Sequence, residues 1–321
     1  MQHSKNGVNM RVLVTGGAGF IGTKLVPMLL SEGYSVRVID NLMYGGFGLL
    51  GNLIDKKFEF INGDITNENL MRKILQDTDY VIHLAALVGY PACDRDPELA
   101  EKVNVKGTQM LTKCLTPEQK LIYSSTGSVY GEVKNELCTE ETPTNALSIY
   151  GETKLKAEQL TLEHDASVVY RFATAFGLSP RLRLDLLINN FVYQAVKNKQ
   201  LIVYQKSFKR TFIHIHDIAR SFVFALKNHE KMAGQVYNVG DNTMNYTKEE
   251  ICNMIKEKVK YYLYFADYDG DKDKRNYEVS YEKINNAGFH TEVTMSEGIE
   301  ELIKAMELIE IPNIYSNHLV I

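Results

Sequence analysis

Short apolar runs alternate with longer amphipathic stretches through the first half of the chain. Six runs rich in β-branched residues have the length and composition of buried strands. They span residues 10–15, 34–39, 58–61, 79–85, 119–124 and 168–173. The helical stretches between them lie at about 20–32, 67–76, 97–115 and 148–165. This alternation predicts an α/β fold with a Rossmann-type, doubly wound parallel sheet that has helices on both faces.

The alternation weakens after about residue 175. Short strands and helices then mix: strands near 201–204, 211–215 and 235–239, and helices near 185–198, 217–228, 247–258 and 296–308. We expect residues 10–175 to form the Rossmann domain and residues 176–321 to form mainly a smaller α/β domain on the substrate side, interleaved with the first. Residues 1–9 are expected to be a disordered extension. Residues 261–281, rich in Tyr, Asp and Lys, predict loop and edge structure.

Composition narrows the class of protein. The 321 residues are 45% hydrophobic and 24% charged, as in a typical soluble domain. A net charge of −4 gives no reason to expect nucleic acid or a membrane surface as partner. No apolar run reaches the ~18 residues of a membrane span, and the start of the chain lacks the apolar core of a signal peptide. The scattered cysteines form no CxxC pair, so we expect reduced thiols, a cytoplasmic location and no metal site.

A glycine cluster follows the first predicted strand. Gly16 permits a tight turn, Gly19 lets the backbone approach a pyrophosphate, and Gly22 lets the following helix pack against the sheet. Phe20 and Ile21 lie at the start of that helix, where the positive end of the helix dipole attracts phosphate. A glycine cluster alone is also typical of a flexible turn. Its position between a strand and a helix favours a dinucleotide-binding site.

Acidic and small residues at later strand ends extend this site. Asp40 ends the second strand, where a carboxylate accepts hydrogen bonds from the ribose hydroxyls of NAD and repels the 2′-phosphate of NADP. Asp40 therefore indicates NAD as the cofactor. The other residues that we place against the cofactor follow the second, third and fourth strands: Asn41, Asp64, Ile65, Ala85 and Ala86. Each alone would be an ordinary turn residue, but together they trace one crevice at the carboxyl edge of the sheet.

A tyrosine and a lysine one helical turn apart are the candidate catalytic pair. Tyr150 and Lys154 lie at i and i+4 on one helix face. A free phenol has a pKa near ~10, and a neighbouring ammonium favours the phenolate that can act as a base. Thr126, at the end of the fifth strand, can hydrogen-bond the reacting oxygen and relay its proton to Tyr150. The Tyr-Lys spacing occurs often by chance on helix surfaces, so its context decides the interpretation.

The complete set of motifs resembles the extended short-chain dehydrogenases/reductases, in their group of NAD-dependent nucleotide-sugar epimerases and dehydratases. The resemblance covers about residues 10–310. Its motifs are TGGAGFIG (15–22), GDI (63–65), HLAA (83–86), NVKGT (104–108), YSSTGSVYG (123–131), YGETK (150–154) and RTFIHIHDIA (210–219). By this resemblance Thr126, Tyr150 and Lys154 are the catalytic residues, and Tyr150 and Lys154 also contact the cofactor.

The resemblance further implies a substrate site in the second half of the chain. Arg210 and Arg275 match arginines that contact the substrate diphosphate, and we add Thr126, Arg181 and Asn190 to this site. Thr174 stands where the family usually has an asparagine that contacts the sugar phosphate, so the resemblance leaves this contact open. Residues 172–191, together with ALVGYPAC at 86–93, look most like GDP-heptose 4-dehydrogenases, and the chain also resembles UDP-glucose 4-epimerases.

The predicted function is oxidation at C4 of a nucleotide-activated sugar. The motifs do not separate an epimerase, which reduces the ketone again, from a dehydrogenase, which releases it, and the nucleotide base also stays open. Gly127 and Ser128 stand where dehydratases of the family carry an Asp-Glu pair, so we expect no 4,6-dehydration. The alternative is a non-catalytic NAD-binding module that senses redox state or scaffolds a complex.

The family resemblance also implies a homodimer. Its members pair two helices from each subunit, here about residues 97–115 and 148–165, in a four-helix bundle. These stretches carry apolar residues that could lie in the interface or face the sheet: Val103, Met110, Leu111, Leu155 and Leu160.

Overall fold

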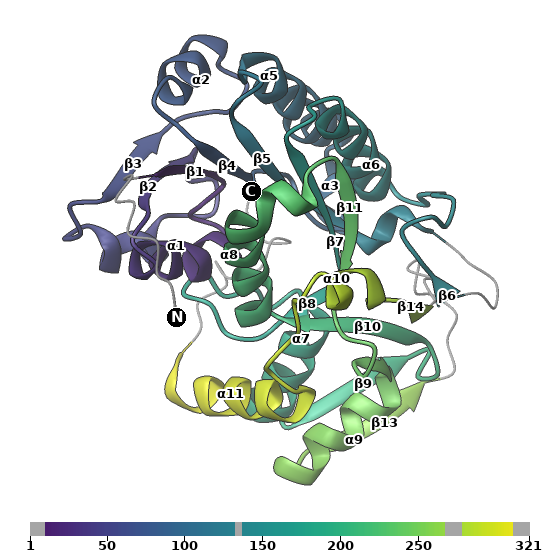
Figure 1. Ribbon diagram of the computed structural model, residues 1–321. Helices are drawn as coiled ribbons and strands as arrows, with labels where there is room; N and C mark the ends of the chain where they lie inside the picture. The colour runs from purple at the N-terminus through teal and green to yellow at the C-terminus, as the bar shows by residue number, and fades with distance from the viewer. Residues whose placement is uncertain (1–9, 132–136, 267–277, 311–321) are drawn as a thin grey trace, which may run out of the picture.

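The computed structural model describes residues 10–131, 137–266 and 278–310. Within these ranges, seven parallel strands form one sheet in the order β11-β7-β5-β4-β1-β2-β3 (Figure 1). Their bounds are β1 Arg11–Thr15, β2 Ser35–Asp40, β3 Phe58–Asn62, β4 Tyr80–His83, β5 Lys120–Thr126, β7 Ser167–Phe172 and β11 Gln235–Val239. The predicted Rossmann-type sheet is confirmed.

Helices cover both faces of this sheet (Figure 1). One face carries α1 (Gly22–Ser31) and α8 (Ile215–Met232). The other carries α2 (Glu68–Leu75), α5 (Gly107–Cys114) and α6 (Ile149–Leu162). Strand side chains alternate between the two cores: Val12 and Val14 pack on the first side, and Leu13 packs on the second.

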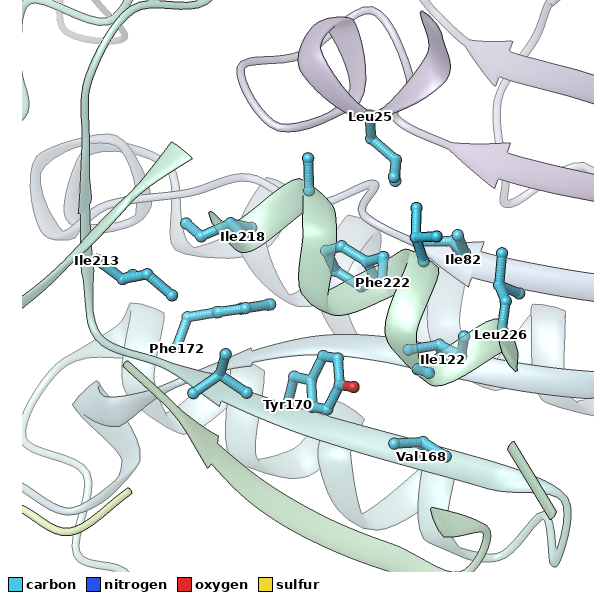
Figure 2. Packing of buried hydrophobic residues seen from close by; sticks show 14 of the residues in the cluster. Leu25, Ile82, Ile122, Val168, Tyr170, Phe172, Ile213, Ile218, Phe222 and Leu226 are labelled. Carbon is cyan, nitrogen blue, oxygen red and sulfur yellow. The ribbon is translucent and has the colours of Figure 1, made fainter. Parts of the chain in front are cut away.

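Aromatic side chains fill the core beneath α8. Tyr170 and Phe172 of β7 pack against Phe222 of α8, with ring centroids 5.8 Å and 5.4 Å from that of Phe222 (Figure 2). Leu25 of α1 and Ile82 of β4 lie in the same cluster. Because α8 and β11 come from the second half of the chain, the chain returns to the first layer after β10 and completes its sheet.

The predicted helix 97–115 is divided into three segments. Asp96 caps α4 (Pro97–Ala100), a π-helical segment η2 (Glu101–Lys106) follows, and α5 completes the stretch. Single π-helical turns inside α-helices occur often at functional sites. Here the wider turn contains the buried Asn104, whose side-chain oxygen accepts from the backbone N–H of Leu87 at 2.7 Å.

A smaller layer lies beside the carboxyl edge of the sheet. It contains the paired strands β8 (Thr174–Phe176), β10 (Lys209–His214) and β12 (Asn245–Thr247), and the parallel pair β9 (Gln200–Tyr204) and β13 (Tyr262–Ala266). Helices α7 (Leu187–Tyr193), η4 (Gln194–Asn198), α9 (Lys248–Lys258) and α11 (Met295–Leu308) enclose its core. The domain boundary near residue 175 stays a prediction.

Short elements connect these layers. They are η1 (Phe47–Asn52), α3 (Tyr90–Arg95), η3 (Gly127–Val129), β6 (Leu137–Cys138), β14 (Glu278–Val279) and α10 (Glu282–Asn286). The expected loop and edge segment 261–281 contains the two-residue β14 and the longer β13, while residues 267–277, like residues 1–9, lie outside the described ranges. Among the helices of the described ranges, none has the length and apolar character that a bilayer span requires.

Candidate active site

A cavity of about 360 Å³ lies at the carboxyl ends of the sheet strands. Its wall begins at Gly16 after β1, continues past Asp40 and Ala85, and reaches Thr126 after β5. Leu186 from the second half of the chain closes part of the opposite side. The crevice expected from successive strand ends is therefore a single cavity.

The glycine turn is shaped to admit a ligand close to its backbone. Gly16 has a φ of +69°, and a Cβ there would lie 2.7 Å from the backbone of Ala85. A Cβ on Gly22 would lie 2.5 Å from the Cα of Gly17, so α1 approaches the turn as closely as glycine allows. Among the described side chains, none caps α1 at Ile21. The first turn of α1 thus faces the cavity as an anion-binding helix end.

Asp40 is held rigidly at the edge of this cavity. Its two carboxylate oxygens accept hydrogen bonds from the backbone N–H groups of Ala18, at 3.0 Å, and Leu42, at 2.8 Å. Burial raises the pKa of Asp40, and the two backbone bonds oppose that shift. Each carboxylate oxygen has a further lone pair that can accept from a ribose hydroxyl. The wall also includes every other cofactor residue predicted from the sequence: Gly19, Phe20, Ile21, Asn41, Asp64, Ile65 and Ala86.

A neutral histidine fixes the backbone of the HLAA motif. Burial lowers the pKa of His83 to about 3, so its ring carries one proton at neutral pH. The Thr108 hydroxyl donates to the carbonyl of Asn104 at 2.6 Å, which makes Nε2 of His83 the donor to Thr108 at 3.0 Å. Nδ1 then accepts from Thr15 at 2.7 Å, and Thr15 accepts from the N–H of Ala85 at 3.1 Å. This chain of bonds holds Ala85 against the cavity.

The three predicted catalytic residues lie on the same cavity wall. Ser148 caps α6 by accepting from the N–H of Gly151 at 3.1 Å, which places Tyr150 in the first turn and Lys154 one turn later. Thr126 ends β5 with its hydroxyl 3.2 Å from the Ser128 hydroxyl. The cavity therefore brings Thr126, Tyr150 and Lys154 to the same ligand space as the glycine turn.

Lys154 lies in a strongly desolvated position. It is only 3% exposed, and its Nζ sits 4.1 Å from the centre of the Tyr123 ring. Burial lowers the pKa of Lys154 to about 7, while the charge of Glu158 one turn further along α6 opposes that shift. Glu158 in turn accepts from Ser125 at 2.6 Å and from Arg171 at 2.6 Å. A buried polar network thus lies behind Lys154.

The predicted substrate residues are distributed differently. Arg181 lies on the cavity wall, whereas neither Arg210 nor Asn190 is among the described wall residues. On β10 the next residue, Thr211, lines the cavity, since neighbouring side chains of a strand point to opposite faces. Asn190 donates to the carbonyl of Leu184 at 3.1 Å and supports the adjacent loop. Arg275 lies outside the described residues, and the substrate roles of all four stay predictions.

Tyr44 and Arg183 are among the wall residues that the sequence patterns did not predict. Tyr44 packs its ring against Arg181, and Arg183 forms an ion pair with Asp185 at 2.5 Å. The PRLRLD segment carries an alternating Arg pattern that could have suggested Arg183 beside Arg181. Nothing in the local pattern around Tyr44 marks it as a site residue. Within the described ranges, no group of three or more His, Cys, Asp or Glu side chains is arranged to hold a metal ion.

Comparison with known proteins decides the family. Residues 12–240 match the model of the NAD dependent epimerase/dehydratase family. The chain belongs to this family. The resemblance to extended short-chain dehydrogenases/reductases that the motifs indicated is thereby confirmed.

Individual relatives of this family align along almost the whole chain. A putative UDP-glucose 4-epimerase from Methanocaldococcus jannaschii is 28% identical and covers 92% of this chain and 98% of its own. A UDP-glucuronic acid 4-epimerase from Bacillus cereus, solved with UDP-glucuronic acid and NAD, has a TM-score of 0.83 at 28% identity, covering 93% and 99%. A dTDP-glucose 4,6-dehydratase from Streptomyces venezuelae has a TM-score of 0.81 at 25% identity, covering 92% and 96%.

As a member of the NAD dependent epimerase/dehydratase family, the chain is an NAD-dependent enzyme. The cavity fits this cofactor. Gly16 and Gly22 pack too closely against Ala85 and Gly17 for a side chain, which fixes the tight turn of a dinucleotide site, and Asp40 offers acceptors to a ribose. Thr126, Tyr150 and Lys154 line the same cavity.

Proposed function

We propose that the enzyme oxidises C4 of a nucleotide-linked hexose or heptose, with Tyr150 as the base. The observation that carries this proposal is the common cavity wall, which joins Thr126, Tyr150 and Lys154 to the cofactor-binding glycine turn. Its relatives support the substrate class, because they include a putative UDP-glucose 4-epimerase and a UDP-glucuronic acid 4-epimerase.

Each catalytic residue has a separate task in this proposal. The Tyr150 phenolate accepts the proton of the C4 hydroxyl, and Thr126 holds the same oxygen by a hydrogen bond. The Lys154 ammonium stabilises the phenolate more strongly in its desolvated position than it would in water. NAD, when bound, takes the hydride that leaves C4.

The ketone formed at C4 has two open fates. It returns to the alcohol with inverted configuration in an epimerase, or it leaves as the 4-keto sugar in a dehydrogenase. Loss of water would require a general acid and a general base beside C5 and C6. Gly127 and Ser128, the residues that follow Thr126 on the wall, carry no group that titrates near neutral pH. We therefore propose that the chemistry stops before dehydration.

A panel of UDP-, GDP-, CDP- and dTDP-linked sugars tests this function. We expect mass spectrometry and NMR to find a 4-keto sugar or a 4-epimer from one member, with no product lighter by one water. Tyr150→Phe should lower turnover by about 10²- to 10⁴-fold, the usual contribution of a general base. The same variant should keep its affinity for NAD. Binding of NAD without turnover of any member would instead favour a redox-sensing or scaffold role.

We also propose that the enzyme acts as a homodimer in the cytoplasm. All four cysteines lie within the described ranges, and they are free and buried. Free thiols support the cytoplasm as the compartment, because its reducing conditions keep cysteines unpaired. The dimer is supported by the outer surface of α5 and α6.

A further inference from the structure

A segment from the second half of the chain crosses the glycine turn. We call residues 179–183, which follow β8, the strap. The Ser179 hydroxyl donates to the carbonyl of Phe20 at 2.7 Å and lies 2.8 Å from the Thr23 hydroxyl. The backbone N–H of Arg181 donates to the same Thr23 hydroxyl at 3.3 Å. The strap is therefore attached to the first turn of α1, the turn that faces a bound pyrophosphate.

The strap also contacts the loop that follows Asp40. The guanidinium carbon of Arg181 lies 5.0 Å from the centre of the Tyr44 ring. Further along this loop, a Cβ on Gly48 would lie 2.4 Å from Thr23 and 3.2 Å from Pro180, so three backbone segments meet closely here. Both α1 and the loop after β2 thus hold the strap over one end of the cavity.

The entry to the strap is fixed as well. Gly177, with a φ of +109°, donates its N–H to Asn189 of α7 at 2.9 Å. Leu178 donates its N–H to Glu301 of α11 at 3.0 Å. The smaller layer therefore holds the strap in one position, which lets it act as a rigid wall of the cofactor site.

We propose that Arg181 binds the diphosphate of NAD and that the strap encloses this end of the cofactor. Arg181 is 5% exposed and lies on the cavity wall, between the first turn of α1 and Tyr44. A guanidinium offers a planar fork of N–H donors that suits a diphosphate. The inference rests on the NAD dependence of the proposed function and moves Arg181 from the predicted substrate site to the cofactor site.

Enclosure on this side has a consequence for the reaction. A cofactor held between α1, the loop after β2 and the strap should exchange more slowly than one bound on an open surface. Slow exchange suits a cycle that returns the hydride to the same sugar. The strap therefore favours the epimerase over the dehydrogenase among the two fates of the ketone.

Calorimetry on the Arg181→Gln variant tests the assignment. ADP-ribose keeps the diphosphate of NAD and lacks nicotinamide. The variant should bind NAD and ADP-ribose about 10- to 100-fold more weakly than the wild-type enzyme does, because it loses a charge-assisted hydrogen bond to the diphosphate. UDP, GDP, CDP and dTDP should bind the variant as they bind the wild-type enzyme. The matched control is Arg72→Gln on the exposed face of α2, whose guanidinium pairs with Glu68 outside the cavity. This control should keep the wild-type affinity for NAD.

Two results would overturn the assignment. One is wild-type NAD affinity in Arg181→Gln. The other is a loss of nucleoside diphosphate binding larger than the loss of ADP-ribose binding, which would return Arg181 to the substrate site. Should Arg181→Gln fail to fold, Arg181→Lys keeps the charge without the fork, and its NAD and ADP-ribose affinities should both fall. If no nucleotide-sugar is turned over but these losses appear, the proposed reaction fails and the cofactor assignment stands.

Discussion

Lys154 joins catalysis to stability at the level of a single residue. Its pKa is about 7 in the folded chain against an ordinary 10.5, because burial disfavours the charged form. The unfolded chain therefore binds more protons between these values. The resulting loss of stability is complete below about pH 7 and disappears as the pH rises past 10.5.

Lys154→Met should consequently stabilise the cofactor-free enzyme while it abolishes turnover. We expect a gain of up to about 4 kcal/mol in the free energy of unfolding at pH 6, which shrinks towards pH 10. Urea unfolding at several pH values measures this difference. Lys256→Met on the exposed face of α9 is the control and should show no such pH dependence. A less stable Lys154→Met variant at pH 6 would contradict the account.

A second prediction at the level of one residue is that Asp40 selects NAD over NADP. Its carboxylate is fixed by the N–H groups of Ala18 and Leu42, so it cannot turn away from a 2′-phosphate without losing both bonds. We expect NADP to bind at least about 10-fold more weakly than NAD, a difference of about 1.4 kcal/mol. Asp40→Ser should narrow this gap. Equal calorimetric affinities of the wild-type enzyme for the two cofactors would refute the role of Asp40.

At the level of elements, a buried ion pair attaches the catalytic helix to the sheet. Glu158 of α6 is 2% exposed and pairs with Arg171 of β7 at 2.6 Å, while it also accepts from Ser125 of β5. The Arg171 guanidinium continues the network to the hydroxyl of Tyr130 at 3.0 Å. This network fixes the distance between the helix that carries Lys154 and the strand that carries Thr126.

Removing one partner of this pair should be costly. Glu158→Gln leaves Arg171 buried without its counter-charge, so we expect a loss of about 3–5 kcal/mol in the free energy of unfolding. The double variant Glu158→Leu, Arg171→Leu should lose less than the sum of the two single variants, because neither charge is left unpaired. Glu163→Gln, exposed at the end of α6, serves as the control for urea unfolding. Additive losses would show that the pair is not coupled.

At the level of the whole molecule, the predicted homodimer depends on the outer surface of α5 and α6. Leu111 is fully buried, and Val103 and Met110 pack on the same core, so these side chains are directed inward. Leu155 packs on the core of the other face. A shallow hollow on the outside is lined by Val105, Gln109, Lys156, Gln159, Leu160 and Glu163. The apolar part of an interface there consists of Val105 and Leu160.

Leu160→Glu should therefore convert the dimer into a monomer. A charge at this position would be desolvated in a packed helix interface and would oppose association. Light scattering at micromolar concentration measures the mass of both forms. A wild-type enzyme that is monomeric under these conditions would show that the family resemblance does not extend to its assembly.

The sequence determined the sheet and the cofactor, because both depend on local patterns. Buried β-branched runs between amphipathic helices indicate a parallel sheet. The dinucleotide site depends on Gly16, Gly22 and Asp40, which lie close together along the chain. The family motifs also predicted that Tyr150 and Lys154 share one helix face, and both residues line the cavity.

Tertiary structure decided which distant residues reach that site. Arg210 and Arg181 are both conspicuous in the sequence, but only the pairing of β10 determines that Thr211 faces the cavity and Arg210 does not. Arg181 comes to α1 through contacts between residues more than 150 positions apart, such as its N–H bond to Thr23. No local periodicity encodes such a contact, because it depends on how the smaller layer folds back over the carboxyl edge of the sheet.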